Sequence, residues 1–204
     1  MKKILLIAYC FLIISCSNTK KDDLKSNVTI REAFNDQEIK DLTMMMNFFE
    51  DQVVSLSNNK YPNREEYLKK YLTQLANNAE NEGLFLNISF KKQKEMYSQI
   101  SDSTFNQIWT IGKYWEFQSP DTLKYLFYNS KGDYIRFMNL LSEDDNLIRN
   151  YYEAFISSKN MSPTMIANVL MRYEELDISD IRIRLFIAVH YLTINDHFER
   201  KEKY

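Results

Sequence analysis

Glycine and proline are scarce in this chain of 204 residues, which contains three of each. Glycine supplies the positive backbone angles that tight hairpin turns need, and proline presets the backbone at many other turns. The low content of both residues therefore favours helices over short strands joined by tight turns. Backbone loops that cradle phosphate groups are equally hard to build from three glycines.

Cysteine and histidine are also rare, with two residues of each. His190 and His197 lie seven positions apart, which on a helix is about 10.5 Å and too far for one shared metal ion. We expect His190 to be buried with its ring hydrogen-bonded, and His197 to be a solvated side chain. The sequence therefore predicts neither a metal ion nor a cofactor.

The common catalytic motifs are missing as well. The chain contains no HExxH, GxSxG or GxxxxGK motif and no EF-hand loop. Glu153, Glu174 and Glu175 are carboxylates of the kind that glycosidases use, but nothing in their spacing marks a catalytic pair. We therefore expect that the protein is not an enzyme.

The N-terminal segment has the three parts of a secretory signal peptide. Met1-Lys2-Lys3 is basic, residues 4–14 form an apolar run, and the small residue Ser15 follows. The apolar run of 11 residues reaches about 16 Å as a helix, roughly half of a bilayer core, so it is too short to span a membrane.

The end of this segment, Ile13-Ile14-Ser15-Cys16, resembles the lipobox of bacterial lipoproteins. The resemblance implies that residues 1–15 are cleaved off and that Cys16 carries a diacylglycerol on its sulfur and an acyl chain on its new N-terminus. It implies a lipid-anchored protein of the cell envelope, in the outer membrane by preference, on its periplasmic or its surface-exposed face. An ordinary signal peptide with an incidental Cys16 is the alternative.

Residues 16–35 are expected to form a lipidated, flexible tether, because residues 17–23 are polar and charged without periodicity. Lys21-Asp22-Asp23 resembles the lysine-plus-acids tag that carries some Gram-negative lipoproteins to the outer face of their outer membrane. An ordinary charged tether explains the same three residues.

Cleavage before Cys16 also changes the charge and the cysteine content. Loss of Lys2 and Lys3 leaves 24 basic against 28 acidic residues, a formal charge of about −4. A mildly acidic chain has no electrostatic footprint for nucleic acid. Because Cys10 leaves with the signal and Cys16 carries lipid, the folded part has no cysteine for disulfides or thiolate metal sites.

Residues 36–204 are expected to form a single, mainly α domain, an irregular bundle of about seven to nine helices. Apolar residues recur every three or four positions from Ile39 to Leu56, and Asn63 with Glu66 forms a capping box for a second helix. Residues 178–194 are apolar on both sides, which predicts a buried helix. Alternation at residues 84–90 and 181–189 also fits strands; we interpret the first as a connection and the second as helix.

The second half of the sequence contains two segments with a similar pattern, which suggests a repeat. Ser103 is expected to cap a helix that carries Phe105, Ile108, Trp109 and Trp115. Ser119-Pro120 and Ser162-Pro163 each place a cap residue before a proline, 43 positions apart, ahead of an apolar stripe. This spacing falls in the range of HEAT-like α-solenoids, although a single irregular domain is the preferred interpretation.

Ten aromatic residues lie between Phe105 and Phe137. Tyrosine and tryptophan suit binding surfaces, and the same residues also fill helical cores. Tyr114, Trp115, Tyr125 and Tyr128 are the members expected to be exposed and to form a binding surface.

Three functions are therefore compatible with the sequence. The preferred one is a lipid-anchored interaction module that binds a protein, for example in self-protection or as an assembly accessory. A glycan-binding lipoprotein is the alternative, and an envelope hydrolase is the third.

Overall fold

The computed structural model describes residues 23–81, 83–115 and 122–203. This part of the chain contains nine α-helices, two short 3-10 helices and one antiparallel strand pair, which confirms the mainly α class and the irregular helical bundle. In chain order the elements are η1 (Leu24–Ser26), α1 (Val28–Ala33), α2 (Asp36–Leu56), α3 (Arg64–Asn81), α4 (Phe90–Tyr97), α5 (Asp102–Ile108), β1 (Trp109–Trp115), β2 (Thr122–Tyr128), α6 (Asp133–Leu141), α7 (Asn146–Ser158), α8 (Pro163–Met171), η2 (Tyr173–Glu175) and α9 (Ile181–Glu199).

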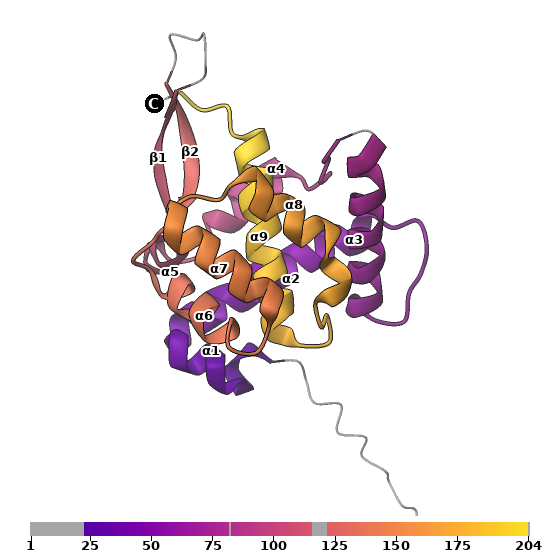
Figure 1. Ribbon diagram of the computed structural model, residues 1–204, viewed down its shortest axis with the longest axis horizontal. Helices are drawn as coiled ribbons and strands as arrows, with labels where there is room; N and C mark the ends of the chain where they lie inside the picture. The colour runs from indigo at the N-terminus through magenta and orange to yellow at the C-terminus, as the bar shows by residue number, and fades with distance from the viewer. Residues whose placement is uncertain (1–22, 82, 116–121, 204) are drawn as a thin grey trace, which may run out of the picture.

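Helix α9 runs through the middle of the molecule (Figure 1), and every residue from Ile183 to Asp196 is buried. A helix that is apolar on all sides needs cover on all sides, and α2, α4 and β2 pack against it. The prediction of a buried helix here is confirmed. The segment from Leu84 to Ser89 has no regular structure and leads into α4, as expected.

Polar groups on α9 find partners on the elements that cover it. The guanidinium of Arg184 donates from Nε to Oε1 of Glu50 in α2 at 2.8 Å, and both side chains are almost fully buried. Asn195 donates to Oε1 of Gln93 in α4 at 2.7 Å. These contacts fix the rotation of α9 against its neighbours, because an unpaired charge or amide at these depths is costly.

Side-chain caps define the ends of several helices. Asn35 and Glu38 form a reciprocal capping box at α2, and Oδ1 of Asn63 accepts from the backbone N–H of Glu66 in α3 at 2.9 Å. Ser162 caps α8 ahead of Pro163, as predicted from the sequence.

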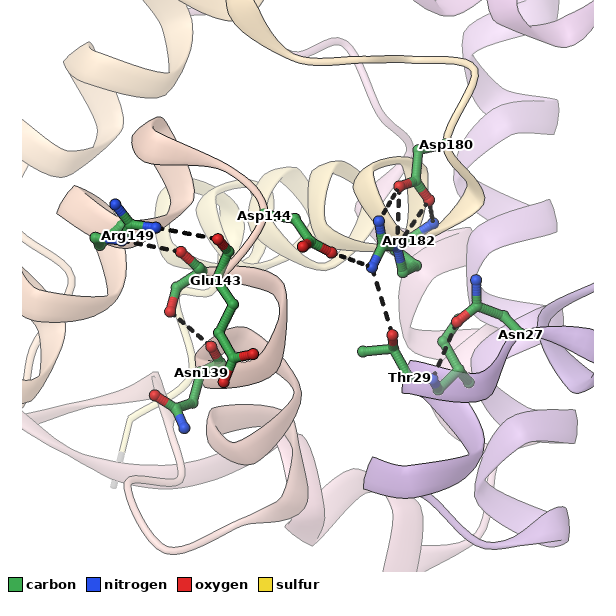
Figure 2. Close-up of polar contacts among 10 residues, drawn as sticks. Asn27, Thr29, Asn139, Glu143, Asp144, Arg149, Asp180 and Arg182 are labelled. Carbon is green, nitrogen blue, oxygen red and sulfur yellow. Dashed lines mark hydrogen bonds and ion pairs between the residues drawn. The ribbon is translucent and has the colours of Figure 1, made fainter.

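The first described element, η1, begins at Leu24, inside the predicted tether of residues 16–35, so that tether is too long. Leu24 and Ile30 are fully buried in the core. Figure 2 shows how Arg182 at the start of α9 reaches Thr29 of α1 (3.4 Å) and Asp144 of the α6–α7 turn (2.7 Å). The short helix α1 is therefore held by burial of its apolar residues and by a contact with a residue that is distant in sequence. Cys16, Lys21 and Asp22 lie outside the described residues.

The helix predicted from Ser103 through Trp115 is wrong beyond Ile108. Helix α5 is capped by Ser101, ends at Ile108 and continues directly into β1. The stripe from Leu123 to Phe127 lies in β2, and Ser119-Pro120 lies outside the described residues. The two proposed repeat units therefore differ in secondary structure, so the solenoid interpretation is wrong.

No helix within these described ranges combines the length and the apolarity that crossing a membrane requires.

His190 lies in the core, as expected. Its Nδ1 is 3.1 Å from the hydroxyl oxygen of Tyr151, and its Nε2 has no hydrogen-bond partner among the residues described. Burial lowers the pKa of His190 to about 3, so the imidazole is neutral in the folded protein.

This burial predicts a loss of stability in mild acid. The unfolded chain takes up a proton on His190 near pH 6.5 and the folded chain does so only near pH 3, so the free energy of unfolding falls as the pH falls between these values. At pH 5 the loss from this residue is about 2 kcal/mol relative to pH 7.5. Urea denaturation at both pH values measures it. His190→Gln, which cannot titrate, should show a shallower pH dependence; an equal dependence in both proteins would contradict the assignment.

Candidate functional site

The strand pair is the part of the molecule that projects from the helical body (Figure 1). The two strands pair in antiparallel register from Trp109↔Tyr128 to Trp115↔Thr122. Both are rich in aromatic and β-branched residues, which fit a pleated surface. We call residues 109–115 and 122–128 the hairpin.

The base of the hairpin is fixed in the core. Trp109 and Tyr128, which face each other across the strands, are 0% and 4% exposed. The indole Nε1 of Trp109 donates to Oγ1 of Thr193 in α9 at 2.8 Å. Tyr128 packs edge-on against Phe155, and burial raises its pKa to about 12. The hairpin is therefore rigidly joined to the central helix.

The middle of the hairpin leans on the end of α9. Tyr125 packs against His197 with ring centroids 4.1 Å apart, and its hydroxyl lies 3.3 Å from Nε2 of His197. The ring of Phe127 covers Gly112, where an added Cβ would lie 2.7 Å from the ring. His197 is half-buried rather than solvated as predicted, and burial, followed by the charge of Lys201, lowers its pKa to about 4.

The outer part of the hairpin exposes large apolar side chains. Trp115 is 72% exposed, Tyr114 48% and Ile111 41%. Side chains alternate along a strand, so Trp115 and Ile111 lie on one face and Tyr114 on the other, next to Tyr125. The exposed side chains therefore lie on both faces of β1 instead of forming one flat patch.

The four aromatic residues predicted as a binding surface have different environments. Trp115 and Tyr114 are exposed, as expected, and Tyr125 is half-buried. Tyr128 belongs to the core, so its assignment to the surface is wrong. The cause is position along the hairpin, because Tyr128 lies at the buried base and Trp115 at the far end.

The C-terminal segment adds a short third strand, which sequence reasoning missed. The backbone N–H of Lys124 donates to the carbonyl oxygen of Glu202 at 2.8 Å, and Leu123 forms an antiparallel bridge with Lys203. The side chains of Lys124 and Glu202 also form an ion pair at 3.8 Å. Arg200, held by Asp196 at 2.7 Å, positions this segment beside β2.

The surface also has hollows, and two of them reach about 350 Å³. One of about 350 Å³, between α3 and the segment before α9, is lined by Glu65, Glu66, Glu174 and Asp177 together with Lys69. The second, of similar size, lies between residues 84–88 and the end of α9 and is bordered by the exposed Phe85 and Phe198. Within the part of the chain that is described, no cluster of histidine, cysteine and carboxylate side chains has the arrangement of a metal site.

Comparison of this chain with protein-family models, with curated proteins and with solved structures finds no match.

The hairpin geometry separates its core aromatics from its exposed ones. Tyr128→Ala removes a buried ring and should cost about 3–5 kcal/mol of unfolding free energy. Trp115→Ala removes an exposed ring and should change that free energy by less than about 0.5 kcal/mol. Urea denaturation measures both, with Tyr128→Phe as the control that keeps the ring. Equal costs for the two alanine variants would place Trp115 in the core and contradict the described geometry.

Proposed function

We propose that the protein is a lipid-anchored, non-catalytic binding module of the bacterial cell envelope that engages a protein partner through the hairpin. The observation that supports this most directly is the exposure of Ile111, Tyr114 and Trp115 on a projecting element whose base is rigid. Large aromatic side chains on a preorganised scaffold lose little conformational entropy on binding, which favours their use as interface anchors.

The position of helix α1 supports the same proposal. Helix α1 lies at the end of the molecule opposite the hairpin (Figure 1). If Cys16 carries lipid, residues 17–23 connect it to Leu24, the first buried residue in the described part of the chain. Seven residues reach at most about 25 Å, and about 15 Å on average if flexible. The α1 end then stays near the membrane and the hairpin faces away from it.

Asp23, the last residue of the proposed export tag, has a local structural role. Its Oδ1 accepts from the backbone N–H of Lys25 at 3.0 Å and so caps η1. The outer membrane remains the preferred location in our proposal, with Lys21, Asp22 and Asp23 as the candidate signal for its outer face. Asp23→Asn keeps the cap while removing the charge, so it suits any test of that signal.

A protein partner is favoured over a glycan by the arrangement of the rings. Tyr114 and Tyr125 pack against each other at 5.7 Å with their planes tilted by 33°, so they do not offer parallel faces on which sugar rings stack. Tyr125 is further covered by His197. Of the four predicted residues, Trp115 is the one whose side chain is mostly exposed.

The lipid anchor gives a direct prediction. Acyl chains hold a protein at a membrane far more firmly than a small apolar patch can. Cys16→Ala should therefore abolish labelling by a clickable palmitate and release the full-length chain into the soluble fraction. Cys10→Ala, which changes the other cysteine, should leave labelling and retention intact. Membrane retention unchanged in Cys16→Ala would rule out the anchor.

The partner can be sought in cells that produce the protein. A photo-crosslinking aromatic residue at position 115 should form a protein adduct, whereas the same residue at Val28, which is 68% exposed on α1, should not form it. Tyr114→Ala together with Ile111→Ala should weaken the adduct at least tenfold, as loss of interface anchors does. An adduct removed by glycosidase would favour the glycan alternative. Identical adducts from both positions would contradict a binding role of the hairpin.

A further inference from the structure

The hollow of about 350 Å³ at the C-terminal end of α9 is formed by two segments that are distant in sequence. Asn195, Phe198 and Glu199 line it from α9, because residues three and four positions apart share one face of a helix. Residues 84–88 line it from the other side. His197, on another face of α9, contacts β2 instead. The hollow and the hairpin therefore use different sides of the same helix.

The wall formed by residues 84–88 is held in place by two hydrogen bonds. The hydroxyl of Tyr71 donates to the carbonyl oxygen of Leu86 at 2.8 Å, and Nδ2 of Asn195 donates to the carbonyl oxygen of Ile88 at 3.3 Å. The side chains of Leu86 and Ile88 are buried, whereas Phe85 between the hollow and solvent is exposed. The hollow is therefore present before a ligand binds, as is usual for ligand sites.

Asn195, which is buried and lines the hollow, has an unused hydrogen-bond acceptor. Its Nδ2 donates to Ile88 and to Oε1 of Gln93, and Nε2 of Gln93 donates to the carbonyl oxygen of Leu192 at 2.8 Å. These bonds fix the orientation of both side-chain amides. No residue in the described ranges donates to Oδ1 of Asn195. An acceptor on so deeply buried a side chain needs a donor, which a ligand in the hollow can supply.

Glu199 gives the hollow a negative charge. Among the described residues that line the hollow it is the one charged side chain, and it takes part in no ion pair with another described residue. The neighbouring Arg200 is instead bound by Asp196 at 2.7 Å and by Glu202 at 3.1 Å. Because α9 ends at Glu199, the negative end of the helix dipole lies here as well. The hollow therefore favours a cation.

The aromatic rim suits the same kind of ligand. Phe85 is 62% exposed and Phe198 41%, and the face of a phenyl ring attracts cations, guanidinium more often than ammonium. A guanidinium is planar and has five N–H donors, so it can bond Glu199 and Oδ1 of Asn195 together, which lie one helical turn apart. Ligand sites begin at about 300 Å³, so the hollow accepts one long side chain.

We propose that this hollow binds an arginine side chain of another protein, with the guanidinium on Glu199 and Asn195 and the methylene stem against Phe85 and Phe198. An apolar side chain would displace water from Glu199 and Asn195 without replacing its hydrogen bonds. The exposed ring of Phe85 offers contact to residues beside the arginine, which favours a peptide over a free small molecule. This site goes beyond the proposed function, because it does not require the hairpin to bind anything.

Blocked amino acids test the site in the full-length chain in detergent, with amide NMR shifts as the readout. N-acetyl-arginine amide should shift the signals of residues 84–88 and 195–199 saturably. The blocked citrulline, which keeps the shape but lacks the charge, should bind about fivefold more weakly or worse, and so should blocked leucine. Equal affinity of the arginine and citrulline probes, or no shift at these residues, would overturn the proposal. Tighter binding of free arginine than of the blocked form would overturn the peptide source.

Variants of the chain test the residues named. Glu199→Gln keeps the size of the side chain and removes its charge, so it should weaken arginine binding about fivefold or more. Glu153→Gln, the same change at an exposed position of α7, should leave binding unchanged. Phe85→Leu keeps an apolar side chain without a ring face and should weaken binding about threefold. Melting temperatures equal to that of the parent chain would show that each variant is folded.

Equal affinities of Glu199→Gln and Glu153→Gln for blocked arginine would overturn the site. If a variant unfolds, the comparison of arginine with citrulline on the parent chain still decides the question. The adduct at position 115 tests the hairpin and the arginine titration tests this hollow, so either can fail without the other.

Discussion

The ion pair between Arg184 and Glu50 lies where the central helix meets its longest neighbour. Both side chains are at most 5% exposed, and the guanidinium donates to the carboxylate at 2.8 Å. A charge at that depth is tolerated only with its partner in place, so the pair sets how α9 sits against α2. Thr193 accepts a hydrogen bond from β1, and Asn195 donates one to α4, so polar groups on α9 also hold these two elements in place. The surrounding elements are therefore arranged to satisfy polar groups on one buried helix.

The long helices could be predicted because each carries its own signals. The stripe from Ile39 to Leu56 and the run after Ile178 need no knowledge of other elements. The segment around Ile30 carries too few residues for a periodic pattern, and packing, the Asn27 cap and the contact of Arg182 with Thr29 order it. Short elements held by contacts that are distant in sequence escape pattern analysis for this reason.

The hairpin was missed because two patterns overlap at its start. Phe105, Ile108 and Trp109 have helical spacing, while Trp109, Ile111 and the residues that follow suit a strand. Composition alone identified the aromatic cluster and named Tyr114 and Trp115 correctly as exposed. It could not separate Tyr128 from them, since burial of that ring depends on where the hairpin enters the core, which is decided by the contact of Trp109 with Thr193.

The hairpin is rigid at its base and exposed at its end, and the two properties together favour binding. An isolated two-stranded ribbon is marginal in water, but here Trp109 and Tyr128 are fixed in the core and Glu202 extends the sheet at the opposite edge. The strand geometry therefore exists before any partner arrives, so little ordering entropy opposes binding through the hairpin. The ion pair of Lys124 with Glu202 adds to this, because it fixes the C-terminal segment against β2. The exposed side chains of Ile111, Tyr114 and Trp115 then supply contact area on a scaffold that is already ordered.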